Sequence, residues 1–85
     1  RLIGEKIMNC VFVQIRCKPG RSLKVVKAIT LKEIHSELYS TSGDFDLFLK
    51  LYIPENVDIS TYINDNLLSI KGIKRTLTTL TFKAF

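Results

Sequence analysis

Cysteine, histidine and tryptophan are scarce in this chain. Its 85 residues include two cysteines, one histidine and no tryptophan. Two cysteines cannot form the disulfide framework on which small secreted domains depend. Cys10 and Cys17 also fall within one predicted strand, about 23 Å apart at ~3.3 Å per residue, so they cannot bridge each other. We therefore expect two reduced thiols, which favours a cytoplasmic protein.

Long apolar runs are also absent. No stretch approaches the roughly 20 apolar residues of a membrane-spanning helix, so no membrane partner is expected. No secretory leader is visible. Hydrophobic residues make up 46% and charged residues 25% of the chain, which is typical of a globular domain. A chain of this length buries a single modest core. We expect one domain over residues 9–85, preceded by a linker or arm over residues 1–8.

Acidic residues are rare at both ends of the chain. Residues 1–32 carry eight Lys and Arg against Glu5 alone, and residues 33–70 carry seven acids against Lys50 alone. Residues 71–85 carry four basic residues and no acid. The net charge is +5, and its distribution along the chain predicts that the molecule has a basic side and an acidic side. Such polarity suits self-association at least as well as binding to a polyanion.

A polar turn that changes abruptly into an apolar strand lies at the centre of the sequence. It reads Thr41-Ser42-Gly43-Asp44-Phe45-Asp46-Leu47. Period-two alternation predicts one apolar face, formed by Phe45, Leu47, Leu49, Leu51 and Ile53, with Asp44, Asp46, Phe48, Lys50 and Tyr52 opposite. A core strand rarely begins with carboxylates at two of its first three positions. This turn is therefore the first candidate for a functional site.

The predicted elements follow in the order strand, helix, strand, strand, helix, strand. The strands cover residues 9–17, 34–41, 44–53 and 73–82, and the helices follow N-cap candidates Ser22 and Asp58. With right-handed crossovers, this order predicts an α+β, ferredoxin-like βαββαβ fold, with a four-stranded antiparallel sheet and two helices on one face. The first and third strands would be central. Four aromatic residues would then lie on the uncovered face, which we expect to pair with a second copy: Phe12, Tyr39, Phe48 and Tyr52.

These elements resemble a known family. The likeness is carried by Val11-Phe12-Val13, Lys18-Pro19-Gly20, Gly43-Asp44-Phe45-Asp46, Lys71-Gly72-Ile73 and Thr76-Leu77-Thr78-Thr79. Together they resemble the C-terminal effector-binding domain of Lrp/AsnC-type transcription regulators, also called the RAM domain. The likeness covers nearly the whole chain, and the Gly-Asp-aromatic-Asp turn is its most specific part. It fits either a segment excised from a full regulator or a stand-alone RAM protein.

The resemblance implies a function in transcription regulation. Such domains pair through their sheets into homodimers, and the dimers associate further, often into a ring of eight subunits. DNA is bound only through an N-terminal helix-turn-helix, which does not occur in this sequence. An amino acid or a similar small effector binds between dimers, near the glycine–aspartate turn and the threonine-bearing last strand. Matching residue for residue nominates Gly43, Asp44, Asp46, Thr76 and Thr78 for effector binding.

The same residues also have ordinary structural explanations. An amino acid needs an acceptor for its ammonium, which Asp44 or Asp46 would provide, and donors for its carboxylate, from the turn N–H groups and the threonine hydroxyls. Alternatively, the aspartates only stiffen the hairpin turn. Thr76 and Thr78 would then be ordinary strand residues. A purely structural oligomerisation domain is therefore the alternative function.

Other classes of function have little support in the sequence. No nucleophile–base pair, phosphate loop or metal cluster occurs, so we expect no enzyme and no cofactor. His35 is a lone histidine and does not indicate a metal site. Siroheme-decarboxylase-like subunits share this type of domain, but they are longer and richer in histidine. The aspartates of the third strand disfavour RNA binding. Lys18, Arg21, Lys24 and Lys27 would form a basic stripe, although most such runs are the exposed face of a helix.

Overall fold

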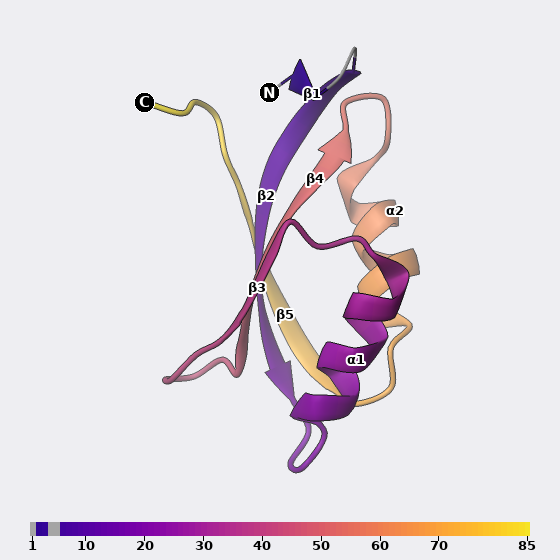
Figure 1. The fold of residues 1–85 in the computed structure, drawn as a ribbon, viewed down its shortest axis with the longest axis vertical. Coiled ribbons are helices and arrows are strands. Elements are labelled where there is room, and N and C mark those ends of the chain that lie inside the picture. The colour runs from indigo at the N-terminus through magenta and orange to yellow at the C-terminus, as the bar shows by residue number, and fades with distance from the viewer. Residues whose placement is uncertain (1, 4–5) are drawn as a thin grey trace.

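The chain forms one antiparallel sheet with its helices on one face, as Figure 1 shows. This computed structural model describes residues 2–3 and 6–85. The elements are β1 (Leu2–Ile3), β2 (Lys6–Cys17), α1 (Ser22–Lys32), β3 (Glu37–Ser40), β4 (Leu47–Pro54), α2 (Ile59–Ile63), the π-helix η1 (Asn64–Leu68) and β5 (Ile73–Leu80). The predicted α+β, ferredoxin-like order is confirmed, and the short β1 adds a fifth strand.

Strand β2 is the axis of the sheet. It pairs with β4 on one side, from Met8 opposite Pro54 to Ile15 opposite Leu47, and with β5 on the other. Strand β3 pairs with the outer edge of β4, and β1 pairs with the start of β2. The first and third predicted strands, β2 and β4, are therefore central, as the sequence indicated.

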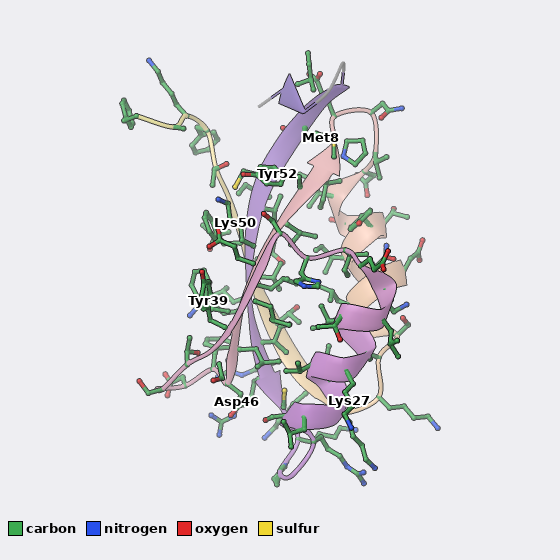
Figure 2. The ribbon with its side chains drawn as sticks, in the orientation of Figure 1. Met8, Lys27, Tyr39, Asp46, Lys50 and Tyr52 are labelled. Atoms are coloured by element: carbon green, nitrogen blue, oxygen red, sulfur yellow. The ribbon has the colours of Figure 1, made fainter. Side chains whose placement is uncertain are left out.

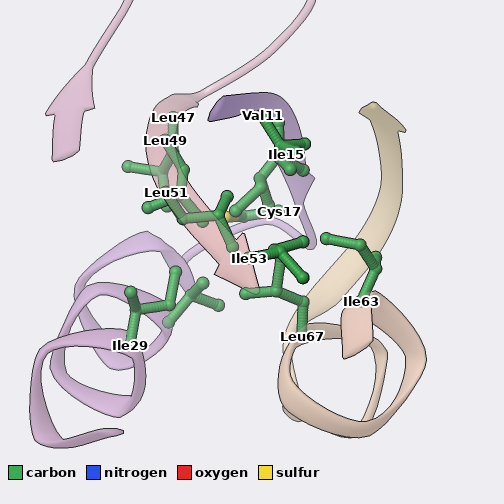
Figure 3. Close-up of a cluster of buried hydrophobic side chains, with 12 residues drawn as sticks. Val11, Ile15, Cys17, Ile29, Leu47, Leu49, Leu51, Ile53, Ile63 and Leu67 are labelled. Carbon is green, nitrogen blue, oxygen red and sulfur yellow. The ribbon is translucent and has the colours of Figure 1, made fainter. Parts of the chain in front are cut away.

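The core lies between the sheet and the helices (Figure 3). Strands β2 and β4 each contribute every second side chain to it, so two alternating rows pack against α1, α2 and η1. Each fully buried Leu or Ile contributes roughly 1.5–3 kcal/mol, so these rows supply much of the folding free energy. The buried residues are Val11, Val13, Ile15, Cys17, Val25, Ile29, Leu47, Leu49, Leu51, Ile53, Ile63 and Leu67.

The two helix starts differ in how they are capped. Asp58 caps α2 as predicted, because its carboxylate accepts hydrogen bonds from the Thr61 N–H and hydroxyl, both at 2.9 Å. These bonds lower the pKa of the Asp58 carboxyl. The prediction for Ser22 was wrong: α1 already includes Ser22, and its N-cap is Arg21, which makes no side-chain capping bond.

The second predicted helix divides into two forms. Its first five residues are α-helical, and residues 64–68 form the π-helix η1. Two side chains bond to carbonyls four residues back: the Asn66 amide donates to Tyr62 O and the Ser69 hydroxyl to Asp65 O. Such bonds compete for the carbonyls of the regular ladder and distort it. Sequence periodicity does not distinguish this distortion from a continuous α-helix.

Strands β3 and β4 begin later in the sequence than predicted. Glu33 ends α1 in a left-handed conformation, with φ of 55°, so the chain needs residues 34–36 to turn back before β3 begins. Strand β4 begins at Leu47 rather than residue 44. Phe45 therefore leaves the alternation, and its ring lies 4.9 Å from the Arg75 guanidinium carbon instead of joining the buried row.

Three further expectations concern the start of the domain, the thiols and membrane-spanning segments. Strand β2 begins at Lys6, three residues before the predicted start, while positions 1, 4 and 5 lie outside the described residues. The boundary between an arm and a domain near residue 9 stays a prediction. Both cysteines are free, and burial raises the pKa of the Cys17 thiol. Within the described part of the chain, no helix is long and apolar enough to cross a membrane.

Gly72 provides a test of the packing between the turn before β5 and the residues at the start of α1. Gly43 and Gly72 have nearly equal positive φ angles, 98° and 101°, but an added Cβ meets nothing within 4 Å at Gly43 and lies 2.9 Å from the Arg21 Cβ at Gly72. Gly43→Ala should therefore cost about 1–2 kcal/mol of backbone strain. Gly72→Ala should cost about 3 kcal/mol because the clash adds to the strain. Urea denaturation measures both, and equal losses would show that the contact relaxes freely.

Candidate functional site

The turn between β3 and β4 is held by hydrogen bonds at its base. The Thr41 N–H donates to Asp46 O at 2.9 Å, and the Thr41 hydroxyl donates to Phe45 O at 3.1 Å. Gly43 lies at the exposed tip with φ of 98°, a conformation that favours glycine. The base of the turn is therefore fixed, and its tip faces solvent.

Asp46 has a structural role inside the sheet. Its carboxylate accepts a 2.7 Å hydrogen bond from the Cys17 N–H, and its own N–H donates to Ile15 O at 2.8 Å. These bonds extend the β2–β4 ladder by one position beyond Leu47, at the point where the pairing of β2 with β5 shifts register. In a single chain, Asp46 therefore stiffens the turn, as the alternative reading of the sequence proposed. Figure 2 labels it at this end of the sheet.

Asp44 has a different environment. Its carbonyl oxygen accepts a 2.7 Å hydrogen bond from Arg16 Nη1, which ties the turn to β2. Its side chain is exposed, and the carboxylate has no partner among the described residues. The N–H groups of Gly43 and Asp44 also donate to no described residue. One carboxylate and two backbone donors are thus free at the same turn.

The two predicted threonines lie elsewhere in the chain. Thr76 is opposite Ile15 and Thr78 is opposite Val13, so both half-buried side chains face the helices. Thr78 lines a groove of about 410 Å³ between β5 and α2. The other lining residues are Ile59, Ser60, Ile63, Asn64 and Leu80. The fold therefore brings Gly43, Asp44 and Asp46 together, and it separates them from the threonines by the width of β2.

The sequence did not single out the polar groups of this groove. Ser60 and Asn64 lie one helical turn apart on α2 and η1, on the side that faces β5. The i, i+4 spacing of two exposed polar residues beside Ile59 and Ile63 was the available signal, but such spacing is common on solvated helix faces. Only the tertiary structure, which places β5 beside this helix, shows that the two side chains line a groove.

The sheet face away from the helices carries aromatic and aliphatic side chains. Tyr39 and Leu77 are 55% and 51% exposed, and the rings of Phe12 and Phe48 lie 5.5 Å apart. No described helix covers this face (Figure 1). The strand registers place these residues on it: Cys10, Phe12, Gln14, Arg16, Glu37, Tyr39, Phe48, Lys50, Tyr52, Arg75, Leu77 and Thr79. We call it the open face.

A charged cluster lies within the open face (Figure 2). The Tyr39 hydroxyl donates to Glu37 at 2.6 Å, and Lys50 Nζ lies 3.2 Å from the same carboxylate. The Tyr39 bond, followed by Lys50, lowers the pKa of the Glu37 carboxyl. The same bond raises the pKa of Tyr39, and Glu37 raises the pKa of Lys50. Lys50 Nζ also lies 5.6 Å from the centre of the Tyr52 ring.

The C-terminal residues lie on the open-face side of the sheet. The Thr81 hydroxyl donates to Cys10 O at 2.7 Å, and the chain continues away from the helices (Figure 1). A cavity of about 690 Å³ lies between this segment and the sheet. It is lined in part by Phe12, Tyr52 and Phe82. This end of the open face is therefore hollowed and mostly apolar.

The described residues contain no group of three or more His, Cys, Asp or Glu that could hold a metal ion. His35 precedes β3, and its Nδ1 is buried without a hydrogen-bond partner among the described residues. The expectation that the chain uses no metal or cofactor stays a prediction.

Comparison with known proteins identifies relatives of the whole fold. Residues 10–85 match the family described as the Lrp/AsnC ligand binding domain. The HTH-type transcriptional regulator FL11 of Pyrococcus abyssi is 28% identical over 72 residues, which cover 85% of this chain and 47% of that protein. The chain thus spans about half the length of the curated relative it matches.

Solved structures with the same fold include one from Thermus thermophilus and one from Neisseria meningitidis. TTHA0845 of Thermus thermophilus has a TM-score of 0.77 and 30% identity, with 92% of this chain and 98% of that chain covered. The transcriptional regulator NMB0573 of Neisseria meningitidis, solved as a complex with L-Met, has a TM-score of 0.77 and 14% identity, with 88% of this chain and 50% of that chain covered.

The two aspartates of the turn should differ in their effect on stability. Asp46→Ala removes the acceptor of the Cys17 N–H and should lower the free energy of unfolding by about 1–2 kcal/mol. Asp44→Ala removes an exposed side chain and should change it by less than about 0.5 kcal/mol. Equilibrium denaturation of the two variants measures the difference, and equal losses would contradict the structural role of Asp46.

The Glu37 cluster should make stability depend on pH in the acid range. Because folding lowers the pKa of Glu37, its contribution is present above the ordinary glutamate pKa and is lost as pH falls through the lowered value. Glu37→Gln should therefore be less stable than the wild type near neutral pH, and the two should converge in acid. Thermal melts across this range test the convergence, with the exposed Glu55→Gln as the control; a constant difference would contradict it.

Proposed function

This chain belongs to the Lrp/AsnC ligand-binding domain family, and on that basis we propose that it binds a small amino acid and joins the subunits of a transcription regulator. Residues 9–85 would be the effector-binding domain and residues 1–8 a linker. In a full regulator, DNA would be bound by a helix-turn-helix outside this sequence. The protein would act in the cytoplasm, where both thiols stay reduced.

The open face supports self-association. It exposes Tyr39 and Leu77 and carries the Phe12–Phe48 pair, with the helices all on the opposite side. Large exposed apolar patches are uncommon on monomers and are typical of interaction surfaces. A second copy placed face to face would bury these rings, and the polar Glu37–Lys50 cluster would help to set the orientation. We therefore assign the dimer interface to the open face.

The observation that carries the effector proposal is the free chemistry of the turn. Asp44 has an exposed carboxylate without a partner among the described residues, and the adjacent Gly43 and Asp44 N–H groups are also unused. A carboxylate accepts from an ammonium, and backbone N–H groups donate to a carboxylate. The turn therefore offers complementary partners to both charged groups of an α-amino acid. The L-Met complex of the Neisseria regulator supports a ligand of this class.

The effector site would be completed between subunits. In one chain, Asp44 and the threonines lie on opposite sides of β2, and Thr78 lines a groove of its own. Contact between dimers can bring the turn of one subunit to the β5 edge of another. Gly43 and Asp44 would then bind the amino acid directly, Thr76 and Thr78 would contribute hydroxyls, and Asp46 would hold the turn in place.

A shared site provides a mechanism for regulation. An effector that contacts two subunits binds the assembled form more tightly than the separate one, so it shifts the population toward assembly. Only this difference in affinity can move the equilibrium. Assembly would in turn change how the attached DNA-binding domains are arranged.

The oligomeric state in the presence of amino acids tests the proposal. We expect native mass spectrometry to show a dimer or a larger species, and one amino acid of a full panel to raise either the subunit number or the melting temperature. A well-folded monomer would contradict self-association. An oligomer that responds to no amino acid would favour a purely structural oligomerisation domain.

Asp44→Ala separates binding from assembly. The variant should fold and assemble as the wild type does, because Asp44 contributes only its backbone carbonyl to the fold. Its melting temperature should no longer respond to the effector, with a loss of affinity of about tenfold or more for a charge-assisted bond. Asp65→Ala removes another exposed carboxylate and should keep the response. An unchanged response in Asp44→Ala would contradict the assignment.

A further inference from the structure

A further pocket lies outside the proposed effector site, where the β2–α1 turn, the start of α1 and the turn before β5 meet. It has a volume of about 460 Å³ and is lined by Lys18, Arg21, Lys24, Lys71 and Gly72. Four of these five residues are cationic, and none is acidic. Figure 2 shows nitrogen-ended side chains around this end of α1, where Lys27 is labelled. Three separate segments of the chain therefore direct positive charge to one place.

Backbone hydrogen bonds hold these segments together. The Lys18 N–H donates to Gly72 O at 2.7 Å, and the Arg21 N–H donates to Lys18 O at 3.0 Å. Gly72 is buried against Arg21, where a side chain would clash. The backbone positions of the cationic residues are thus set by the fold, although their side chains are exposed. The arrangement differs from a run of lysines along one helix face.

The positive charge of the pocket is not balanced within the described chain. None of the four cationic residues of the pocket forms an ion pair with a described residue. The ion pair found among the described residues joins Lys50 to Glu37. The first turn of α1 contains no acid, so the helix N-terminus adds to the positive potential. Asp46 lines the neighbouring smaller pocket beside Lys18, but its carboxylate accepts from the Cys17 N–H. Several like charges around one cavity, with no opposite charge on its lining, create a positive potential that attracts an anion.

We propose that this basic pocket binds a small polyphosphate, meaning a ligand with two or more phosphate groups in succession. Such a ligand matches several cations around one cavity, and lysine and arginine are the usual partners of phosphate oxygens. An amino acid fits poorly, because its ammonium would meet four cations and no carboxylate side chain. This site is therefore separate from the turn at Asp44 and does not depend on the proposed effector.

The layout favours a small polyphosphate over the backbone of DNA. A DNA backbone presents regularly spaced phosphates and requires cations along a path. Here the cations surround one cavity, and Lys27, the next lysine along α1, does not line it. The regularly spaced phosphates of a duplex would therefore contact few of the pocket's cations.

Calorimetric titration with inorganic tripolyphosphate at roughly 50 mM salt, where screening is weak, tests the proposal. The wild type should bind one tripolyphosphate per chain. Lys24→Gln should weaken binding about tenfold, because it removes a charge-assisted contact. Lys27→Gln is the matched control: it changes the net charge equally, three residues along the same exposed helix face, and should weaken binding less than about twofold. Both lysines are exposed, so the two variants should fold alike.

Three results would overturn the proposal. The first is absence of tripolyphosphate binding by the wild type. The second is equal weakening by Lys24→Gln and Lys27→Gln, which would indicate attraction by net charge alone. The third is binding of a short DNA duplex that tripolyphosphate does not displace, which would make the cluster a nucleic-acid contact. Displacement of bound tripolyphosphate by a nucleoside triphosphate would support the proposal and identify a nucleotide as a source of the phosphates.

Discussion

The pairing of β2 with strands on both sides is the constraint on which the rest of the structure depends. Because β2 bonds to β4 and β5 along most of its length, its side chains have only two directions, toward the helices or toward the open face. Val11, Val13 and Ile15 occupy the first direction and are fully buried. A slip of one residue would reverse both faces, so the buried row determines the composition of the open face as well.

The same ladder decides which chemical groups are free. At the end of β2, the Asp46 carboxylate serves as the partner of a backbone N–H and so becomes part of the sheet. Asp44, two residues earlier, contributes its carbonyl and leaves its carboxylate exposed. Two aspartates with the same chemistry in the sequence thus have separate roles. The proposed division between a residue that binds an effector and one that positions the turn follows from this difference.

The molecule presents three surfaces of distinct chemistry. The open face is aromatic with a central charged cluster, the turn at Asp44 offers an acceptor beside backbone donors, and the basic pocket offers cations without counter-charges. A protein that assembles through one surface and binds ligands at the others can couple ligand binding to assembly when a ligand contacts more than one subunit. The proposed basic pocket lies within a single chain, so it would be present in every assembly state.

Much of the fold was determined by local sequence patterns. The alternation of Leu47, Leu49 and Leu51 and the cap at Asp58 act over a few residues, which is why the order of elements and the buried row of β4 could be predicted. The resemblance to the Lrp/AsnC family also rested on such local motifs.

Other features depended on contacts between segments distant in sequence. Phe45 lies before the start of β4, beside Arg75 of β5, instead of in the buried row, and Asp46 joined the ladder because the end of β2 passes next to it. The separation of Asp44 from Thr78 required the strand order, and the basic pocket required β5 to return beside α1. Local patterns set which elements form and which faces they bury, whereas only the tertiary structure decides which side chains remain free to bind.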